Sequence, residues 1–353
     1  MIPAAGVWER LAAAGIVSGT APPAADDPSP WYVTAMLGVA AWLSALFLLA
    51  FAGVALSDLF RTATSMLVLG MLVCAAAIAA LRVAGNSVFA TQLGIAASLA
   101  GQALVAFGVL DGGARNAVSW AVIAVFEAIL VAVAPQYMHR VLATLGAAVA
   151  LRMALGAAAV AALFPAAVAA AFVAAQGATP QRLLRDSLWA PVSTGLALAL
   201  LLVIPFALLE SLFFAAGRSA PFAGVAAWAG TGAVACVLVA SIGRLLREAG
   251  IDSRSRTGMW ALAGGILLSL AAWPVPGVVV ALIVLLEAFA AGRRVLAGLA
   301  VVALLAALGH YYYALQAPLL VKAAALAATG VVLLGARFAL RLARGGGPEA
   351  DHA

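Results

Sequence analysis

The sequence predicts an all-α protein, a polytopic bundle of about twelve transmembrane helices. Of the 353 residues, 66% are hydrophobic and 9% are charged, whereas a soluble domain carries roughly 25% charged residues. The apolar residues form runs of about 16 to 25 separated by short charged joints, the length a helix needs to cross roughly 30 Å of hydrocarbon. The runs are continuous rather than alternating, and backbone polar groups in lipid must be satisfied internally. We therefore expect helices and not a barrel.

Twelve candidate spans follow one another along the chain. They lie near residues 33–56, 63–81, 88–110, 117–134, 139–156, 158–176, 192–216, 222–243, 258–273, 276–291, 293–313 and 317–340. Two hairpins, around Gly156 and around residues 273–276, have short halves that also fit re-entrant segments. Ten spans is therefore the alternative count.

The distribution of basic residues predicts the orientation, because loops rich in Lys and Arg stay preferentially in the cytoplasm. With both termini inside, fourteen arginines fall on the cytoplasmic side and three on the outer side, Arg61, Arg115 and Arg218. This bias favours an even number of spans in a bacterial inner membrane. It also explains the net charge of +6, and because the arginines are spread over many loops, we expect no nucleic-acid partner.

The two ends differ in composition from the spans. Residues 1–30 lack the basic start and apolar core of a signal peptide, and Val7–Val17, which includes Trp8, fits a short amphipathic helix on the inner surface. Residues 21–30 contain four prolines and two aspartates and predict a stiff linker. Residues 344–353 predict a disordered cytoplasmic tail.

Landmarks recur in the same order in two halves of the chain, residues 31–176 and 177–343. The pairs are Cys74 with Cys236, Leu99-Ala100-Gly101 with Leu262-Ala263-Gly264, Glu127 with Glu287, and Arg140-Val141-Leu142-Ala143 with Arg294-Val295-Leu296-Ala297. Six spans separate the partners, so the halves would be parallel six-helix repeats. The alternative is chance similarity between Ala/Leu/Val-rich segments.

Ionisable groups inside spans are the default functional candidates, because each costs roughly 2.5 to 3.5 kcal/mol at the bilayer centre. Glu127 lies in the middle of the fourth span, Glu287 lies in the tenth, and Glu210 lies in the seventh. Arg152 interrupts the fifth span and is placed to pair with Glu127 or Glu210. These residues predict a proton-, cation- or solute-binding site. Structural ion pairs are the alternative.

Four uncharged polar residues are candidates for lining a cavity. They are Gln102, Thr194, Thr231 and Ser241. Hydrogen bonding between helices is the ordinary role of such residues in a membrane bundle, and we favour it for all four, while Gln102 is also included in the candidate site.

Patterns typical of enzymes are missing from the sequence. His139, His310 and His352 lie in separate joints and the tail, so no helix presents paired histidines for zinc or haem. The two cysteines lie in spans, where a thiol behaves as a small apolar group. We expect no enzymatic activity, no cofactor and no metal site.

The C-terminal hairpin carries a tyrosine cluster, Gly309-His310-Tyr311-Tyr312-Tyr313-Ala314-Leu315, followed by Leu319-Leu320-Val321-Lys322. These residues, with the Trp8 segment and Gln92-Leu93-Gly94-Ile95-Ala96, resemble the bacterial membrane-protein family called domain of unknown function 4401. The resemblance implies an inner-membrane location and carries over no catalytic residue. Tyr311, Tyr312 and Tyr313 occupy an outer aromatic belt, where they would anchor the helix or contact an envelope partner.

Two functions fit the sequence. The first is a transporter-like protein for a small solute or proton-linked substrate, with a site near Glu127 and Glu287. The second is a non-catalytic membrane subunit that binds partner proteins through Trp8 to Val17 and the outer tyrosines. The scarcity of polar residues in the spans argues against a large hydrophilic substrate. The sequence does not determine the oligomeric state.

Overall fold

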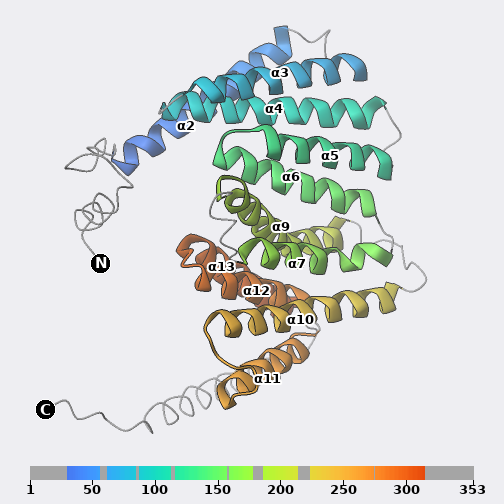
Figure 1. The fold of residues 1–353 in the computed structure, drawn as a ribbon. Helices are drawn as coiled ribbons and strands as arrows, with labels where there is room; N and C mark the ends of the chain where they lie inside the picture. The colour runs from blue at the N-terminus through green and yellow to red at the C-terminus, as the bar shows by residue number, and fades with distance from the viewer. Residues whose placement is uncertain are drawn as a thin grey trace, which may run out of the picture. The chain divides into compact units, whose positions relative to one another are not determined.

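The computed structural model describes residues 30–55, 62–84, 87–112, 116–156, 159–177, 186–213, 223–273 and 275–314. These residues form helices joined by caps and turns, and no strand occurs among them (Figure 1). The predicted all-α class is confirmed for this part of the chain. The chain divides into two compact units, Met1–Gly108 and Val109–Ala353.

The first unit contains α2 (Trp31–Ala55), α3 (Ala63–Val83) and most of α4 (Val88–Gly112). The Trp42 indole of α2 donates a hydrogen bond of 3.1 Å to the Gln92 side chain of α4. Helices α3 and α4 cross at glycines, since a Cβ added at Gly101 would lie 2.6 Å from Cys74 Sγ and 2.8 Å from Gly70 O. The two helices can approach this closely only because glycine has no side chain.

The second unit contains one short 3-10 helix and eight α-helices in the part that the structure describes. They are α5 (Ala117–Val133), α6 (Tyr137–Leu155), η2 (Ala159–Leu163), α7 (Phe164–Gln176), α9 (Asp186–Phe213), α10 (Ala223–Glu248), α11 (Arg256–Ala271), α12 (Pro276–Ala290) and α13 (Arg294–Ala314).

Helix α12 lies at the centre of this unit. Its consecutive residues Val278, Val279, Val280 and Ala281 are each at most 9% exposed. At about 100° per residue these four positions surround the helix, so α12 is covered on all sides. Its neighbours are Phe172 of α7, Leu200 of α9, Leu238 of α10 and Leu296 of α13, which are buried in the same core. A polar side chain in the middle of α12 is therefore held away from both lipid and water, whereas Phe289 near its end is exposed.

The predicted spans between residues 33 and 313 coincide with these helices to within a few residues, with three exceptions. Helix α9 begins at Asp186 rather than near 192, α10 continues to Glu248 rather than ending near 243, and the predicted span 158–176 consists of η2 followed by α7. Pro276 opens α12, and Gly156, with φ of +56°, ends α6, so the chain breaks at both expected positions. The spanning or re-entrant character of the short segments beside them stays a prediction. The predicted amphipathic helix Val7–Val17, the linker 21–29, the last span 317–340 and the tail 344–353 lie outside the described residues.

Four of the described helices are long and apolar enough to cross a membrane, and they support the membrane-protein class. They are α3, α4, α6 and residues Val225–Glu248 of α10. Some of the other apolar helices are shorter: α12 has 15 residues, or about 22 Å at 1.5 Å per residue, against a hydrocarbon thickness of roughly 30 Å.

Candidate functional site

Glu287, near the end of the central helix α12, is 1% exposed. Its Oε1 accepts a hydrogen bond of 2.5 Å from the Ser241 hydroxyl of α10, and its Oε2 forms an ion pair with the Arg244 guanidinium of the same helix. Ser241 itself is fully buried. Both oxygens of this buried carboxylate are therefore held by one neighbouring helix, a geometry that fixes α10 against α12.

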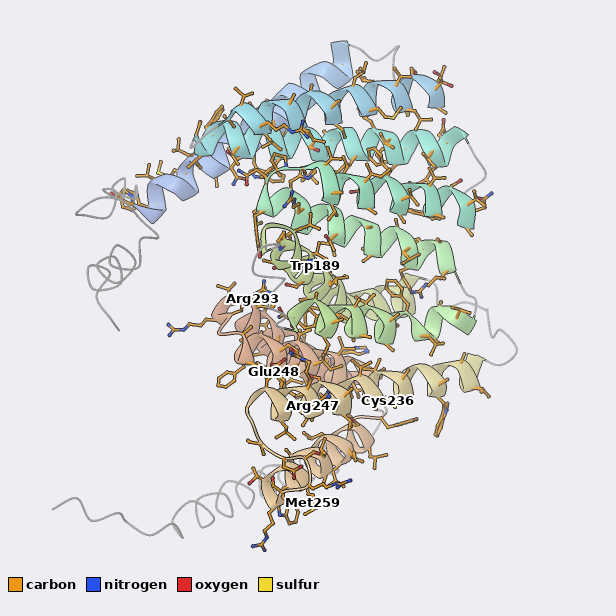
Figure 2. All side chains as sticks on the ribbon, viewed as in Figure 1. Trp189, Cys236, Arg247, Glu248, Met259 and Arg293 are labelled. Atoms are coloured by element: carbon orange, nitrogen blue, oxygen red, sulfur yellow. The ribbon has the colours of Figure 1, made fainter. Side chains whose placement is uncertain are left out.

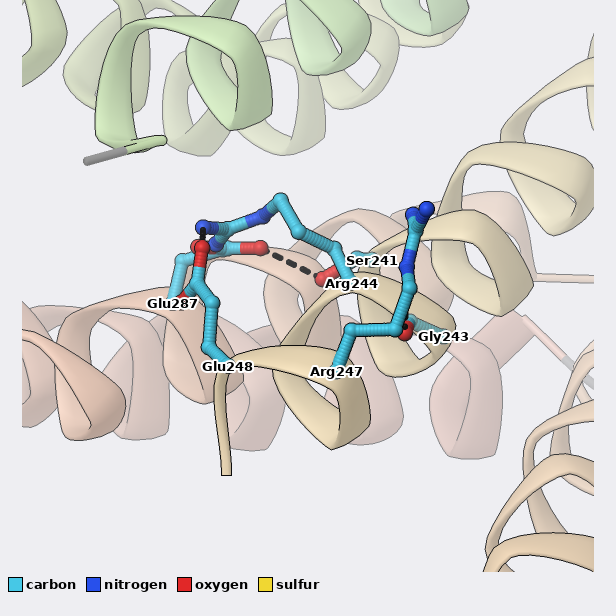
Figure 3. A network of polar contacts seen from close by, with 6 residues as sticks. All are labelled: Ser241, Gly243, Arg244, Arg247, Glu248 and Glu287. Atoms are coloured by element: carbon cyan, nitrogen blue, oxygen red, sulfur yellow. Dashed lines mark hydrogen bonds and ion pairs between the residues drawn. The ribbon is translucent and has the colours of Figure 1, made fainter. Parts of the chain in front are cut away.

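Arg244 also pairs with a second carboxylate, Glu248, one turn further along α10. Ser241, Arg244 and Glu248 lie three and four residues apart, so they project from one face of the helix. Figure 3 shows this face, with Arg244 between Glu248 and Glu287, whereas Arg247 extends away and bonds the Gly243 carbonyl at 3.2 Å. One guanidinium thus joins a buried carboxylate to an exposed one, since the Glu248 side chain is 46% exposed.

Ser241, Arg244, Glu248 and Glu287 form a polar cluster. Such a cluster can bind a charged group and exchange one ionic partner for another. A buried carboxylate needs a cationic partner or a proton, because an unpaired charge in a low-dielectric interior is costly. The Nε–H of Arg244 is buried and has no hydrogen-bond partner among the described residues. This leaves one donor next to Glu287 for an acceptor on a ligand.

Glu127, the other predicted carboxylate, is 5% exposed on α5 and faces α6. A Cβ added at Gly146 would lie 3.2 Å from the Glu127 Cδ, so the glycine provides the space that the carboxyl group occupies. Glu287 makes its polar contacts with α10 and not with Glu127. The two carboxylates are both buried, as expected of functional candidates, but they lie in different helix contacts.

Arg152 and Gln102 make bonds close to their own positions. The Arg152 Nη1 donates to the Gly156 carbonyl at 3.0 Å at the end of α6. Gln102 is 7% exposed, and its amide donates to the Ser98 hydroxyl at 3.3 Å, one turn earlier on α4. Neither bond tests their predicted role in a binding site, which stays a prediction.

Several predicted contact residues lie beyond what the structure describes. Glu210 belongs to α9, but its side chain is outside the described residues, as are the side chains of Tyr311 and Tyr313 and the whole of Trp8. Tyr312 is half-buried at the end of α13. The role of this group as partner contacts stays a prediction.

Sequence reasoning gave Arg244 only a topological role and placed Ser241 among the ordinary interhelical bonds. The bond from Ser241 to Glu287 confirms that expectation for the serine. The role of Arg244 was missed, because its partner lies 43 residues away in the chain. The available signal was the Ser-Arg-Glu spacing along one face of an otherwise apolar helix.

A groove of about 430 Å³ lies between α10 and α11 and is almost entirely apolar. The groove is lined by Cys236, which is exposed on α10, and by Trp273. Trp273 packs against Trp228 with ring centroids 5.5 Å apart.

Cys74, in contrast, is buried between α3 and α4, where its thiol donates to the Ser98 carbonyl at 3.5 Å. Among the described residues no three His, Cys, Asp or Glu side chains form a metal-binding group.

Comparison with known proteins gives one family for this chain. No curated protein and no solved structure matches it significantly. The family model described as Domain of unknown function (DUF4401) matches residues 30–343, which is nearly the whole chain and includes every described helix. The chain therefore belongs to the DUF4401 family.

Proposed function

We propose that this protein is a transporter-like protein of the bacterial inner membrane that moves a small or proton-linked solute. The observation that carries the proposal is the buried carboxylate of Glu287, held by Ser241 and Arg244 inside an otherwise apolar bundle. Intramembrane ionisable residues are expensive, and in transport proteins they bind ions and protons. The shared guanidinium provides a means of releasing Glu287 from its pair.

The proposed mechanism is an exchange of partners at Arg244. With Glu287 ionised, Arg244 binds both carboxylates and locks α10 to α12. When Glu287 takes up a proton or a small cation, its need for Arg244 disappears, and the guanidinium retains Glu248 as a partner. The contact between α10 and α12 is then weakened, which favours a second arrangement of these helices.

The proposed topology has twelve spans with both termini in the cytoplasm. The arginine bias and the agreement between predicted spans and helices support it. Under this topology Arg244, Glu248 and Arg293 lie at cytoplasmic helix ends. The polar cluster around Glu287 is therefore near the inner side, accessible from the cytoplasm through the exposed Glu248.

Two parallel repeats would explain the paired landmarks. Helices α3 to α6 correspond in order to α10 to α13, and the third helix of each set carries a buried glutamate, Glu127 or Glu287. In each set the third and fourth helices form a hairpin. This order supports the proposed duplication over residues 31–176 and 177–343, which parallel-repeat transporters also have.

The test is a flux measurement with purified full-length protein in liposomes that contain a pH-sensitive dye. Under an imposed pH gradient or membrane potential, wild type should dissipate the pH gradient faster than protein-free liposomes. Glu287→Gln should abolish this flux, and Glu127→Gln should reduce it. Arg247→Gln is the matched control, because it removes a nearby charge that extends away from the cluster and bonds the Gly243 carbonyl, and it should keep most of the flux.

Two results would overturn the proposal. One is wild-type flux equal to that of empty liposomes under every gradient, including gradients of small organic and inorganic cations. The other is a Glu287→Gln variant that keeps normal flux.

A non-catalytic membrane subunit is the second candidate function. The groove between α10 and α11 favours it, because this groove is almost entirely apolar and offers no site for a polar solute. Crosslinking and purification from native membranes should then recover a stoichiometric protein partner. A chain that purifies alone from gentle detergent would contradict this second function.

A further inference from the structure

Arg293, labelled in Figure 2, lies in the turn between α12 and α13. It contacts hydroxyl groups from two other helices. Its Nη1 donates to the Ser193 hydroxyl of α9 at 3.0 Å, and its Nη2 donates to the Tyr137 hydroxyl of α6 at 3.4 Å. Nη2 also donates to the Thr194 hydroxyl. One guanidinium therefore links α6, α9 and the α12–α13 turn.

The directions of the hydrogen bonds follow from counting hydrogens. Ser193 and Thr194 each donate to the Ala190 carbonyl at 2.9 Å, so both hydroxyls accept from Arg293. Tyr137 and Thr194 are 2.6 Å apart, and because the Thr194 hydrogen is used, Tyr137 is the donor in that bond. The hydroxyl hydrogens are all committed, and the charge of Arg293 faces only neutral oxygens.

The contrast with Arg244 is informative. Arg244 is neutralised by two carboxylates, whereas Arg293, which is also partly buried, forms no ion pair with any described residue. Of its five N–H donors, the three bonds to hydroxyls leave the Nε–H and one hydrogen of Nη1 unused. Tyr137, at 43% exposed, places the cluster at the surface of the unit.

We propose that Arg293, held in place by the hydroxyls of Tyr137, Ser193 and Thr194, binds a phosphate-class anion through its unused N–H donors. A guanidinium is the preferred group for phosphate, and the three hydroxyls, whose hydrogens are used elsewhere, orient the guanidinium. The site lies at a helix turn, where lipid headgroups meet a membrane bundle, and basic pockets between helices are known to bind anionic headgroups. Free phosphate has the same chemistry. This inference does not depend on the proposed transport function.

The experiment measures binding to purified full-length protein by native mass spectrometry and calorimetry. Wild type should retain phosphatidylglycerol in preference to phosphatidylcholine. Arg293→Gln should weaken this binding by roughly tenfold or more, the loss expected for one charge-assisted hydrogen-bonding group. Arg294→Gln is the matched control, because it removes an exposed neighbouring charge and should change binding by less than about threefold.

Inorganic phosphate, titrated separately, distinguishes the two sources. Binding of both phosphate and phosphatidylglycerol indicates recognition of the phosphate group itself, and binding of the lipid alone indicates a headgroup site. If Arg293→Gln does not fold, Arg293→Lys keeps the charge, removes the planar fork and should still weaken binding. Equal losses of binding in the Arg293 and Arg294 variants would overturn the proposal. So would a wild-type protein that neither prefers phosphatidylglycerol to phosphatidylcholine nor binds inorganic phosphate.

Discussion

The buried pair between Arg244 and Glu287 makes a quantitative prediction about stability. Replacing Arg244 by Met removes the cation from a carboxylate that is 1% exposed and leaves it with the Ser241 hydroxyl alone. Breaking a buried pair in this way costs about 3–5 kcal/mol, because an uncompensated charge remains in the interior. Protonation of Glu287 removes the uncompensated charge and so reduces this cost. At acidic pH we therefore expect a loss of stability in the lower part of this range.

Two further variants provide comparisons for the loss of stability in Arg244→Met. Glu248→Gln removes a carboxylate that is 46% exposed from the same arginine, and such surface pairs contribute about 0–1 kcal/mol. The double variant Arg244→Met with Glu287→Met replaces both buried charges by apolar groups of similar length. It should recover most of the loss, since an apolar pair can be as stable as a buried ion pair.

The assay is unfolding of the detergent-solubilised protein by increasing SDS, followed by near-ultraviolet circular dichroism, with free energies of unfolding compared among the four proteins. The expected order of stability is wild type, Glu248→Gln and the double variant close together, with Arg244→Met clearly lowest. An Arg244→Met protein within about 1 kcal/mol of Glu248→Gln would refute the reasoning, because it would mean that Glu287 does not need its cation.

Other variants test the helix contacts. Gly101→Ala should destabilise the protein by about 1–3 kcal/mol in the same assay, because its Cβ would meet Cys74 Sγ at 2.6 Å, whereas Gly264→Ala, with open space around its Cβ, should be neutral or slightly stabilising. A destabilised Gly264→Ala protein would contradict this. An apolar thiol reagent should label the exposed Cys236 in detergent and leave the buried Cys74 unmodified until the protein is unfolded; equal labelling rates would count against the described burial.

Much of the helix arrangement could be predicted from the sequence, because membrane helices are coded locally. Long apolar runs bounded by Arg, Gly or Pro set the ends of helices such as α6, which ends at Gly156, and α12, which begins at Pro276. The class of the fold follows from composition alone. What the sequence could not supply was which helix lies at the centre, since α5 is as apolar as α12 and yet exposes Val122, Val125 and Ile129.

The candidate site was predicted only in part for the same reason. Glu127 and Glu287 were identified because a charge within an apolar run is a local signal. Their partners depend on tertiary packing: Ser241 and Arg244 lie 46 and 43 residues before Glu287. The cluster of Arg293 with Tyr137 brings together residues 156 apart. From the sequence alone, an arginine at a helix end is explained by its place in a cytoplasmic loop. Only the packing of the helices shows which carboxylate or hydroxyl it binds.

The glycines of the two proposed repeats pack differently in the two halves. Gly70 and Gly101 hold α3 and α4 in close contact around Cys74. At the same separation as the cysteines, the second half has Gly232 on α10, and Gly264 follows on α11. A Cβ at Gly232 would meet only the Trp273 ring, at 3.6 Å, and Gly264 faces open space. Helices α10 and α11 instead border the groove next to Cys236.

If the two halves are related, the corresponding glycines therefore lie once in close contact and once beside open space, although α10 and α11 still touch where Gly265 packs against Ile242. Small residues allow a close approach but do not enforce it, so under the proposed transport function we expect α10 and α11 to close over the groove. Closing the groove would move α10, and α10 carries both Ser241 and Arg244. The ion pair to Glu287 is thus attached to the helix that has room to shift, and breaking that pair is the step that would release it.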